Sequence, residues 1–384
     1  MLRWLTAGES HGPQLTVVIE GLPAGLELTA EDLRRDLRRR QGGHGRGGRQ
    51  QIEVDQARIV GGVRGGLTLG SPIALVLENR DHANWTEQMT PAPEGYAPRP
   101  VTRLRPGHAD LAGVLKYGHD DVRNVLERSS ARETAARVAA GGLARKLLAR
   151  FGVRVLSFVQ SIGPVDAGYD RVDPERVTDE EIESSPVRCP DLDAGPRMVA
   201  EIDAAGARGD TLGGTFRVVA TGLVPGLGSY VHWDRKLDAR LAMAILSINA
   251  VKGVEFGAGF EGSARPGSAF HDEIDFSEGR FRHLSNRAGG LTGGVTNGEP
   301  LDIRAALKPI STMKKPMRSV DLATKERVDA HYERSDVCVV PAAGVVGEAM
   351  VALTLADAYL EKFGGDSVAE MERNVRGYLA SIGL

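Results

Sequence analysis

Hydroxyl, guanidinium and carboxylate side chains are concentrated in residues 127–134, directly before an Ala-rich run. Ser130, followed three residues later by Glu133, has the spacing of a capping box at a helix N-terminus. Free N–H groups at a helix start, flanked by Arg128 and Arg132, suit an anion such as a phosphate. The stretch therefore predicts either a capped surface helix or an anion site at a helix start.

Two histidines lie in candidate loops that carry other polar groups. Ser10 and His11 stand together between glycines, but adjacent residues rarely align as nucleophile and base, and the G-x-S-x-G spacing is absent. His11 therefore fits a general acid near a departing anion better than a hydrolase base. His108 follows Arg103 and Arg105, which indicates an anion pocket that contains an ionisable group. An ordinary turn or loop histidine remains the alternative in both cases.

Three further segments offer groups for anions or protons. Residues 38–49 alternate arginine with glycine, which fits an RNA-binding tract, a clamp over a phosphorylated ligand or a solvated loop. Residues 308–312 supply ammonium and hydroxyl donors that suit phosphate, although a basic turn is equally consistent. Arg334 lies two residues before Asp336. We expect this carboxylate either to accept or relay a proton at a ligand site, or to form a local salt bridge and a helix cap.

Composition narrows the class of protein. The chain has 384 residues, 41% hydrophobic and 26% charged, with a formal net charge of −3, so no global basic field favours nucleic acid. Cys189 and Cys338 lie far apart without metal-ligand spacing, so neither a zinc site nor a disulfide framework is expected. The N-terminal residues lack the apolar run of a signal peptide, and a cytoplasmic protein without membrane spans is expected.

Two parts of the chain repeat the same motifs in the same order. Residues 17–26 are echoed by residues 218–227, and residues 127–130 are echoed by residues 333–336. Each of the latter stretches precedes a long apolar helix that ends in Phe-Gly. This order predicts an internal duplication of a strand–helix–strands–helix unit. The two apolar helices are expected to share a core with sheets outside, so that both Glu-Arg-Ser starts face one site.

These motifs together resemble the signature regions of the chorismate synthase family. The resemblance rests on residues 8–12, residues 127–134, and Arg334-Ser335-Asp336 with Gly347-Glu348, in that order along the whole chain. It also includes the arginine loop and residues 308–312. It implies an α+β fold in which central helices lie between two antiparallel sheets. On that basis a single catalytic domain, 1–384, is expected, with pseudo-repeat halves at approximately 1–155 and 205–365.

The resemblance also implies a reaction. Members of the family remove phosphate and a ring hydrogen from 5-enolpyruvylshikimate 3-phosphate by a 1,4-anti elimination, which gives chorismate in the last common step of aromatic amino acid biosynthesis. They need reduced FMN although the reaction has no net redox change. The implied partners are the small-molecule substrate, three further copies in a homotetramer, and an external flavin reductase, with NADPH serving only indirectly. Neither a metal nor a nucleic acid is implied.

Individual roles are implied by the same resemblance. His11 resembles the acid that assists phosphate departure, His108 the group near flavin N1, and Asp336 the carboxylate near flavin N5. The implied FMN-binding residues are Arg128, Ser129, Ser130, Asn249, Ala250, Gly293, Lys308, Pro309, Ile310, Ser311, Thr312 and Arg334. Arg40 and Arg46 correspond to positions assigned to NADP in some members. The implied substrate-binding residues are Ser10, Arg40, Arg46, Arg49, Arg105 and Arg132.

Two other functions compete with this interpretation. A flavin oxidoreductase that itself oxidises NADPH would need a dinucleotide-binding site, but no G-x-G-x-x-G lies between a strand and a helix. A non-enzymatic RNA-binding protein would have to rely on residues 38–49, which are short and lack aromatic residues. Residues 79–107, long and Pro-rich, are expected to form a lid together with the arginine loop.

Overall fold

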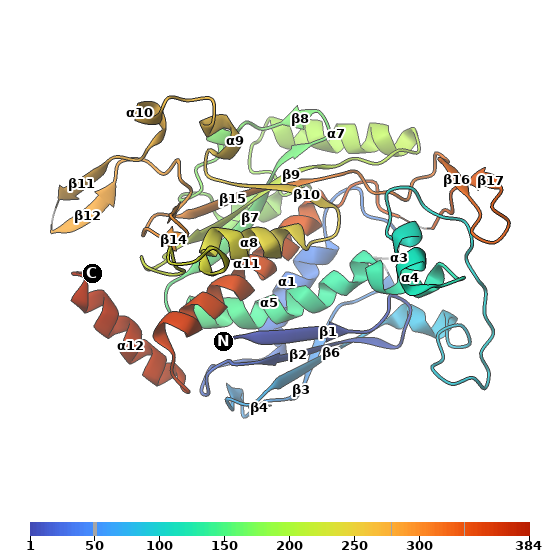
Figure 1. The fold of residues 1–384 in the computed structure, drawn as a ribbon, viewed down its shortest axis with the longest axis horizontal. Coiled ribbons are helices and arrows are strands. Elements are labelled where there is room, and N and C mark those ends of the chain that lie inside the picture. The colour runs from blue at the N-terminus through green and yellow to red at the C-terminus, as the bar shows by residue number, and fades with distance from the viewer. Residues whose placement is uncertain (49–51, 278, 334) are drawn as a thin grey trace.

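The computed structural model describes residues 1–48, 52–277, 279–333 and 335–384, and its elements are arranged as helices between two sheets (Figure 1). The lower sheet in this view has the antiparallel order β1-β2-β6-β3 and the upper sheet the order β10-β15-β9-β7-β8. Their strands are β1 (Arg3–Ala7), β2 (Gln14–Glu20), β3 (Ala57–Gly61), β6 (Ile73–Glu78), β7 (Arg154–Ile162), β8 (Val165–Asp166), β9 (Gly214–Thr221), β10 (Val251–Phe256) and β15 (Leu301–Leu307). The predicted fold class is confirmed.

The layer between the sheets consists of α1 (Ala30–Gln41), α5 (Thr134–Ala149), α8 (Leu237–Leu246) and α11 (Val340–Phe363). Thr29 and Asp32 form a capping box at the start of α1. Leu33 and Leu37, one turn apart, are buried against the core. The local sequence therefore fixes both where α1 begins and which face it buries.

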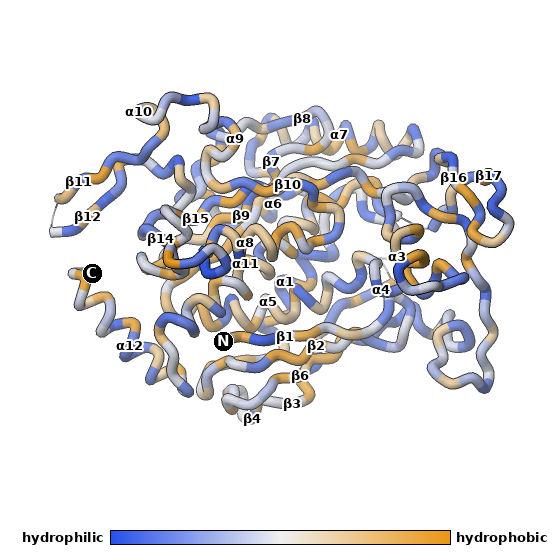
Figure 2. Tube along the Cα trace, viewed as in Figure 1, coloured by the Kyte–Doolittle hydropathy of each residue, from blue (hydrophilic) through white to orange (hydrophobic). Residues whose placement is uncertain are grey.

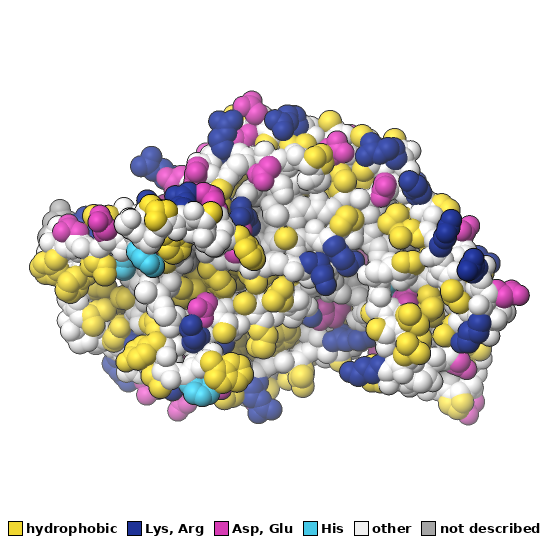
Figure 3. All heavy atoms as spheres, turned by 45° about the horizontal axis from the view of Figure 1, so that its top comes forward, with side chains coloured by type: hydrophobic (Ala, Val, Ile, Leu, Met, Phe, Trp, Pro, Cys, Tyr) yellow, Lys and Arg dark blue, Asp and Glu magenta, His cyan; other side chains and the backbone are white. Residues whose placement is uncertain are grey.

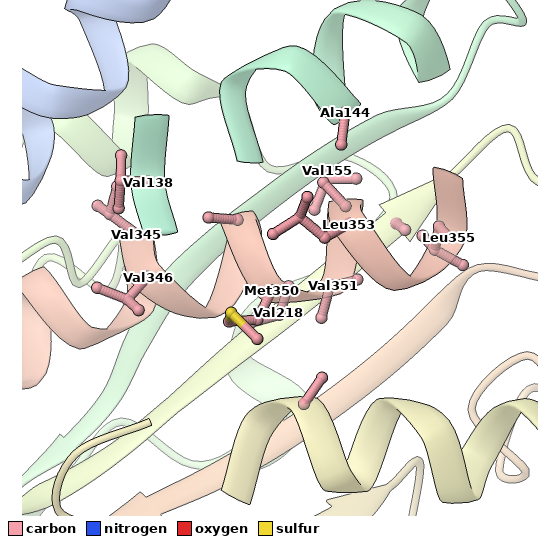
Figure 4. Packing of buried hydrophobic residues seen from close by; sticks show 14 of the residues in the cluster. Val138, Ala144, Val155, Val218, Val345, Val346, Met350, Val351, Leu353 and Leu355 are labelled. Atoms are coloured by element: carbon pink, nitrogen blue, oxygen red, sulfur yellow. The ribbon is translucent and has the colours of Figure 1, made fainter. Parts of the chain in front are cut away.

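α11 is apolar on all sides because it is enclosed on all sides. Figure 4 shows its valines and leucines between Val138 of α5 and Val218 of β9, and Figure 2 shows hydrophobic residues along both sheets and this helix. Within the described residues, α11 is long and apolar enough to cross a membrane, but 89% of its apolar window is buried inside the protein. It is therefore a core helix.

Glycine allows α5 and α11 to approach each other closely. A Cβ atom built on Gly141 of α5 would lie 2.3 Å from the Cβ atom of Ala349 on α11, a distance that real side chains do not tolerate. On the opposite side of α11, a Cβ atom on Gly347 would lie 2.7 Å from the ring of Phe216 on β9. The helix pair and the upper sheet are thus packed at the closest possible spacing.

The two sheets repeat one connection order. In chain order, β1, β2, β3 and β6 occupy the same relative places as β7, β9, β10 and β15, and α1 and α8 follow the second strand in each set. α5 and α11 then follow the last strand of each set. In this match β7 is the counterpart of β1, and halves at approximately 1–155 and 205–365 stay a prediction.

The start of α5 differs from the predicted capping box. A further helix, α4 (Arg123–Ser129), stands in front of it, and the chain enters α5 through a 3-10 turn, η2 (Ala131–Glu133). Ser130 is a cap, but its Oγ accepts from Arg132 N at 3.3 Å. The Glu133 carboxylate instead accepts from Arg137 Nε at 2.9 Å. The tight turn brings a different N–H to the serine, so the predicted Glu133 capping box is wrong.

The remaining elements cover the ends of the layers. They are β4 (Val63–Arg64), β5 (Leu67–Thr68), η1 (Arg80–Asn84), α3 (Asp110–Tyr117), η3 (Tyr169–Arg171), α6 (Asp179–Ser184), α7 (Ala194–Ala207), η4 (Trp233–Arg235), α9 (Gly259–Gly262), α10 (Gly267–Phe270), β11 (Ile274–Ser277), β12 (Arg280–His283), β13 (Leu291–Thr292), β14 (Val295–Thr296), β16 (Arg318–Val320), β17 (Arg327–Asp329) and α12 (Val368–Ser381). Thr178 caps the start of α6. The predicted lid, residues 79–107, contains η1.

Candidate active site

A cavity of about 510 Å³ lies where the starts of α5 and α11 meet. The first start contributes Ser129, Ser130 and Arg132, and the second contributes Ser335 and Asp336. The two echoing stretches therefore face one site, as the sequence predicts. Figure 3 shows basic and acidic side chains close together near the middle of one face of the molecule.

Most of the predicted site residues line this cavity. They are Ser10, His11, Arg40, Arg46, Arg105, His108, Ser129, Ser130, Arg132, Asn249, Ala250, Lys308, Ile310, Ser311, Thr312 and Asp336. Arg128, Gly293 and Pro309 do not line it. Arg49 and Arg334 lie outside the described residues.

His11 is held by a carboxylate and an aromatic ring. Its Nδ1 atom lies 2.8 Å from Glu127 Oε1, and its backbone N–H donates to Glu127 Oε2 at 2.8 Å. The ring centroid lies 4.1 Å from that of Trp85, which η1 and the following turn position. Asp81 Oδ2 lies 3.9 Å from Nε2. A ring fixed in this way can present Nε2 for proton transfer.

His108 is anchored to the start of α3. Its Nδ1 atom lies 2.6 Å from Asp110 Oδ1, and Arg105 Nε donates to Asp110 Oδ2 at 2.8 Å. Burial alone would raise the pKa of Asp110, but the bonds from His108 and Arg105 hold this pKa well below its usual range. Asp110 is therefore a fixed anion that orients both neighbours towards the cavity.

Asp336 is held by the glycine-rich loop, residues 42–48. Its Oδ1 accepts the Gly47 N–H at 2.5 Å, and its Oδ2 lies 3.1 Å from Arg46 Nη1. A Cβ atom on Gly47 would lie 2.9 Å from the Ser335 carbonyl oxygen, so the close approach requires glycine. The carboxylate thus contacts a guanidinium and a backbone N–H at the cavity.

Arg40 and Arg132 share one buried carboxylate. Asp55 Oδ2 accepts from Arg40 Nη2 at 2.8 Å, and Asp55 Oδ1 pairs with Arg132 Nη1. Burial alone would raise the pKa of Asp55, but the two guanidiniums lower it. Arg132 Nη2 also lies 3.6 Å from Glu53 Oε2, so both guanidiniums are fixed at the cavity wall, where planar donors of this kind suit a phosphate or carboxylate ligand.

Some buried donors at the cavity have no partner in the part of the chain that the structure describes. They are Arg40 Nε and Arg46 Nε, both on side chains that line the cavity. Lys308 lines the same cavity, and burial and the charge of Lys252 lower its pKa. Unsatisfied buried donors are costly, so an anionic ligand would relieve them.

Several lining residues were not predicted. Glu53, Asp81, Trp85 and Glu333 line the cavity, and Glu127 lies behind His11. The polar alternation through Glu53 and Asp55 after the arginine loop was an available signal, because alternating residues share one face of an extended chain. Asp81 and Trp85 had no comparable signal beyond their place in the predicted lid.

Comparisons with known proteins agree on one family. A family model described as chorismate synthase matches residues 2–360. The chain is 60% identical to a chorismate synthase of Desulforudis audaxviator, with 100% of this chain and 98% of the relative covered, and 58% identical to one of Symbiobacterium thermophilum, with 99% of each covered. A solved structure, "Crystal Structure of Chorismate Synthase", is similar with a TM-score of 0.81 and 42% identity, covering 99% of this chain and 98% of that one.

Proposed function

The chain belongs to the chorismate synthase family, and we propose that it removes phosphate from 5-enolpyruvylshikimate 3-phosphate with the help of reduced FMN. Membership makes it a carbon–oxygen lyase acting on a small phosphorylated molecule. The observation that supports the finer proposal is that one cavity contains two anchored histidines, a carboxylate and several guanidiniums. Such a set can bind a multiply charged anion and transfer protons beside it.

The cavity residues fit a flavin phosphate and the substrate's acidic groups. The unsatisfied Arg40 Nε and Arg46 Nε donors favour anions, and Ser129, Ser130 and Thr312 add hydroxyls near Lys308. We assign the cofactor to the wall that carries Ser129, Asn249 and residues 308–312. We assign the substrate to the wall with Arg40, Arg105 and Arg132. When bound, a reduced flavin supplies electron density transiently to the breaking C–O bond.

Side chains of the protein supply and accept the protons of the elimination. A C–O bond and a C–H bond of the substrate break, a C=C bond forms, and phosphate leaves with the electron pair of the C–O bond. His11 donates a proton from Nε2 to the departing phosphate, and Asp336 offers an ionised carboxylate that accepts or relays the ring proton. His108, fixed by Asp110, holds a proton towards the cofactor. Arg40 and Arg132 hold the acidic groups in register.

Assembly and supply of reductant remain part of the proposal. Exposed Tyr230, Trp233 and Met243 lie on α8 and the loop before it, and Figure 3 shows hydrophobic side chains in several patches on the face that it presents. Such a surface favours contacts between copies, and a homotetramer is proposed. We also propose that an external flavin reductase supplies reduced FMN in the cytoplasm, with NADPH serving only indirectly.

An anaerobic assay tests this function directly. Purified protein with the phosphorylated substrate and dithionite-reduced FMN should form chorismate, whereas NADPH with oxidised FMN should not support turnover. His11→Ala and His108→Ala should each lower kcat by about 10- to 1000-fold. Absence of chorismate with reduced FMN would overturn the proposed reaction, and full activity in either variant would remove that histidine from it.

A further inference from the structure

We propose that Glu127, held in place by Arg123, is a positioning residue that fixes the ring orientation and the tautomer of His11. This inference rests on the proposed function, in which His11 donates the proton to the departing phosphate. Glu127 does not itself line the cavity, and it acts through the histidine.

Both oxygens of the Glu127 carboxylate bind the same residue. Oε1 lies 2.8 Å from His11 Nδ1, while Oε2 accepts the His11 backbone N–H at 2.8 Å. The Ser10 N–H also donates to the Glu127 carbonyl oxygen at 3.0 Å. A carboxylate accepts but cannot donate, so His11 Nδ1 must carry a proton. Nε2 is then the ring nitrogen available for proton exchange at the cavity.

Arg123 holds the outer side of this carboxylate. Its Nη1 atom donates to Glu127 Oε1 at 3.0 Å, and its Nη2 atom donates to Glu333 Oε1 at 3.2 Å. The guanidinium lies 4.7 Å from the Trp85 ring centroid, and the same ring packs against His11. Carboxylate, guanidinium, indole and imidazole therefore form one packed group with little freedom to rotate.

The charges of this group keep Glu127 ionised. Burial alone would raise the pKa of Glu127, but hydrogen bonds and charge from His11, with a further bond from Arg123, lower it. An ionised carboxylate behind an imidazole can hold the tautomer without taking the proton itself. Glu127 and Glu333 begin the two echoing motifs, and one guanidinium joins them.

The central experiment is a double-mutant cycle on the full-length enzyme with reduced FMN. Glu127→Gln keeps the shape, but an amide cannot accept from both the His11 ring and the His11 backbone N–H. It should lower kcat about 10- to 100-fold while KM and the Kd for FMN change less than about threefold. The variant that combines His11→Ala with Glu127→Gln should be no slower than His11→Ala alone, because the two residues act as one unit.

Glu255→Gln is the matched control. Glu255 also accepts from an arginine, Arg304, and from a backbone N–H, that of Phe260 at 2.8 Å, but it lies outside the cavity. Its replacement should leave kcat unchanged. Equal losses of kcat in both variants, or additive losses in the double mutant, would mean that Glu127 is only structural, and would overturn the inference.

Nitrogen NMR of histidine-labelled protein gives a readout without turnover. At a pH where the His11 ring is neutral, the wild type should show the proton on Nδ1, and Glu127→Gln should show a mixture of the two tautomers. An unchanged tautomer would overturn the inference. If Glu127→Gln does not fold, Glu127→Asp replaces it: this shorter carboxylate should lower kcat less than tenfold, and wild-type kcat would count against positioning. Full turnover in His11→Ala would remove His11 from the reaction and would overturn this inference with it, whereas absence of chorismate with the wild type and reduced FMN would refute the proposed function instead.

Discussion

The starts of α5 and α11 carry the same motif but surround it with different chemistry. Ser130, before α5, is neutral: its Oγ accepts from Arg132 N and lies 3.0 Å from Ser10 Oγ. Asp336, in the corresponding place before α11, is an anion held by Arg46 and the Gly47 N–H. The duplicated scaffold therefore fixes where a polar group stands at the cavity, while the identity of that group is free to differ.

The largest effect on kcat is expected when the polar group at each of these two positions is replaced. Asp336→Asn should keep the Gly47 bond but lose the proton-accepting charge, so kcat should fall about 100- to 1000-fold while FMN still binds. Ser130→Ala should lower kcat much less. Steady-state kinetics and FMN titration of both variants are the measurements. Equal losses of kcat in the two variants would contradict the proposed difference between the two positions.

A second test addresses the contact that brings the two starts together. Gly141→Ala would place a methyl group against Ala349, forcing α5 and α11 apart at a cost of about 1–3 kcal/mol in the free energy of unfolding. Urea denaturation measures this loss. Gly377→Ala in α12 is the control, because nothing lies within 4 Å of its Cβ position, and helix propensity favours alanine there. A stable Gly141→Ala protein would show that the helices tolerate a wider spacing.

A third test uses pH on the two glutamates that begin the motifs. Burial alone would raise the pKa of Glu333, but His331, Arg123 and Arg105 lower it to about 2 from the ordinary 4.5. Because this pKa is depressed, its stabilisation is present above about pH 4.5 and is lost as the pH falls towards 2. The free energy of unfolding of the wild type minus that of Glu333→Gln is the quantity to measure. This difference should be about 1–2 kcal/mol larger at pH 6 than at pH 2.5. Urea denaturation of both proteins at each pH measures this difference, and a difference that does not change with pH would contradict the prediction.

The smallest expected effect concerns the caps themselves. Ser130→Ala removes the bond from Arg132 N and should cost about 0.5–1 kcal/mol in the ligand-free protein. Ser335→Ala should cost almost nothing, because the Val339 cap of α11 makes no side-chain bond and proline stands in the first turn instead. Thermal unfolding of both variants measures the difference. A larger loss at Ser335 would reverse this part of the comparison.

Local signals in the sequence predicted local features well. The two long apolar helices depend on neighbours within one or two turns, and the structure confirms them as α5 and α11. The contact partners of the site residues, by contrast, lie far away in the sequence. His11 meets Glu127 across 116 positions, and no spacing in the sequence encodes such a contact.

Helix geometry explains why Arg128, which the resemblance assigns to the site, does not line the cavity. Adjacent residues of a helix point about 100° apart, so Glu127 and Arg128 of α4 cannot both face the same direction. Glu127 turns inwards to His11, and Arg128 donates to the carbonyl oxygens of Thr6 and Gly8. The sequence could not reveal α4, because residues 123–129 lack a strong cap and a regular apolar stripe.

The close contact between Gly141 and Ala349 has a dynamic consequence. Two helices that pack at backbone distance have little room to shift against each other, which favours a rigid frame. Ligand exchange must then depend on the peripheral loops moving over a rigid frame. Hydrogen exchange should therefore slow in the loops on ligand binding, while α5 and α11 stay protected in both states.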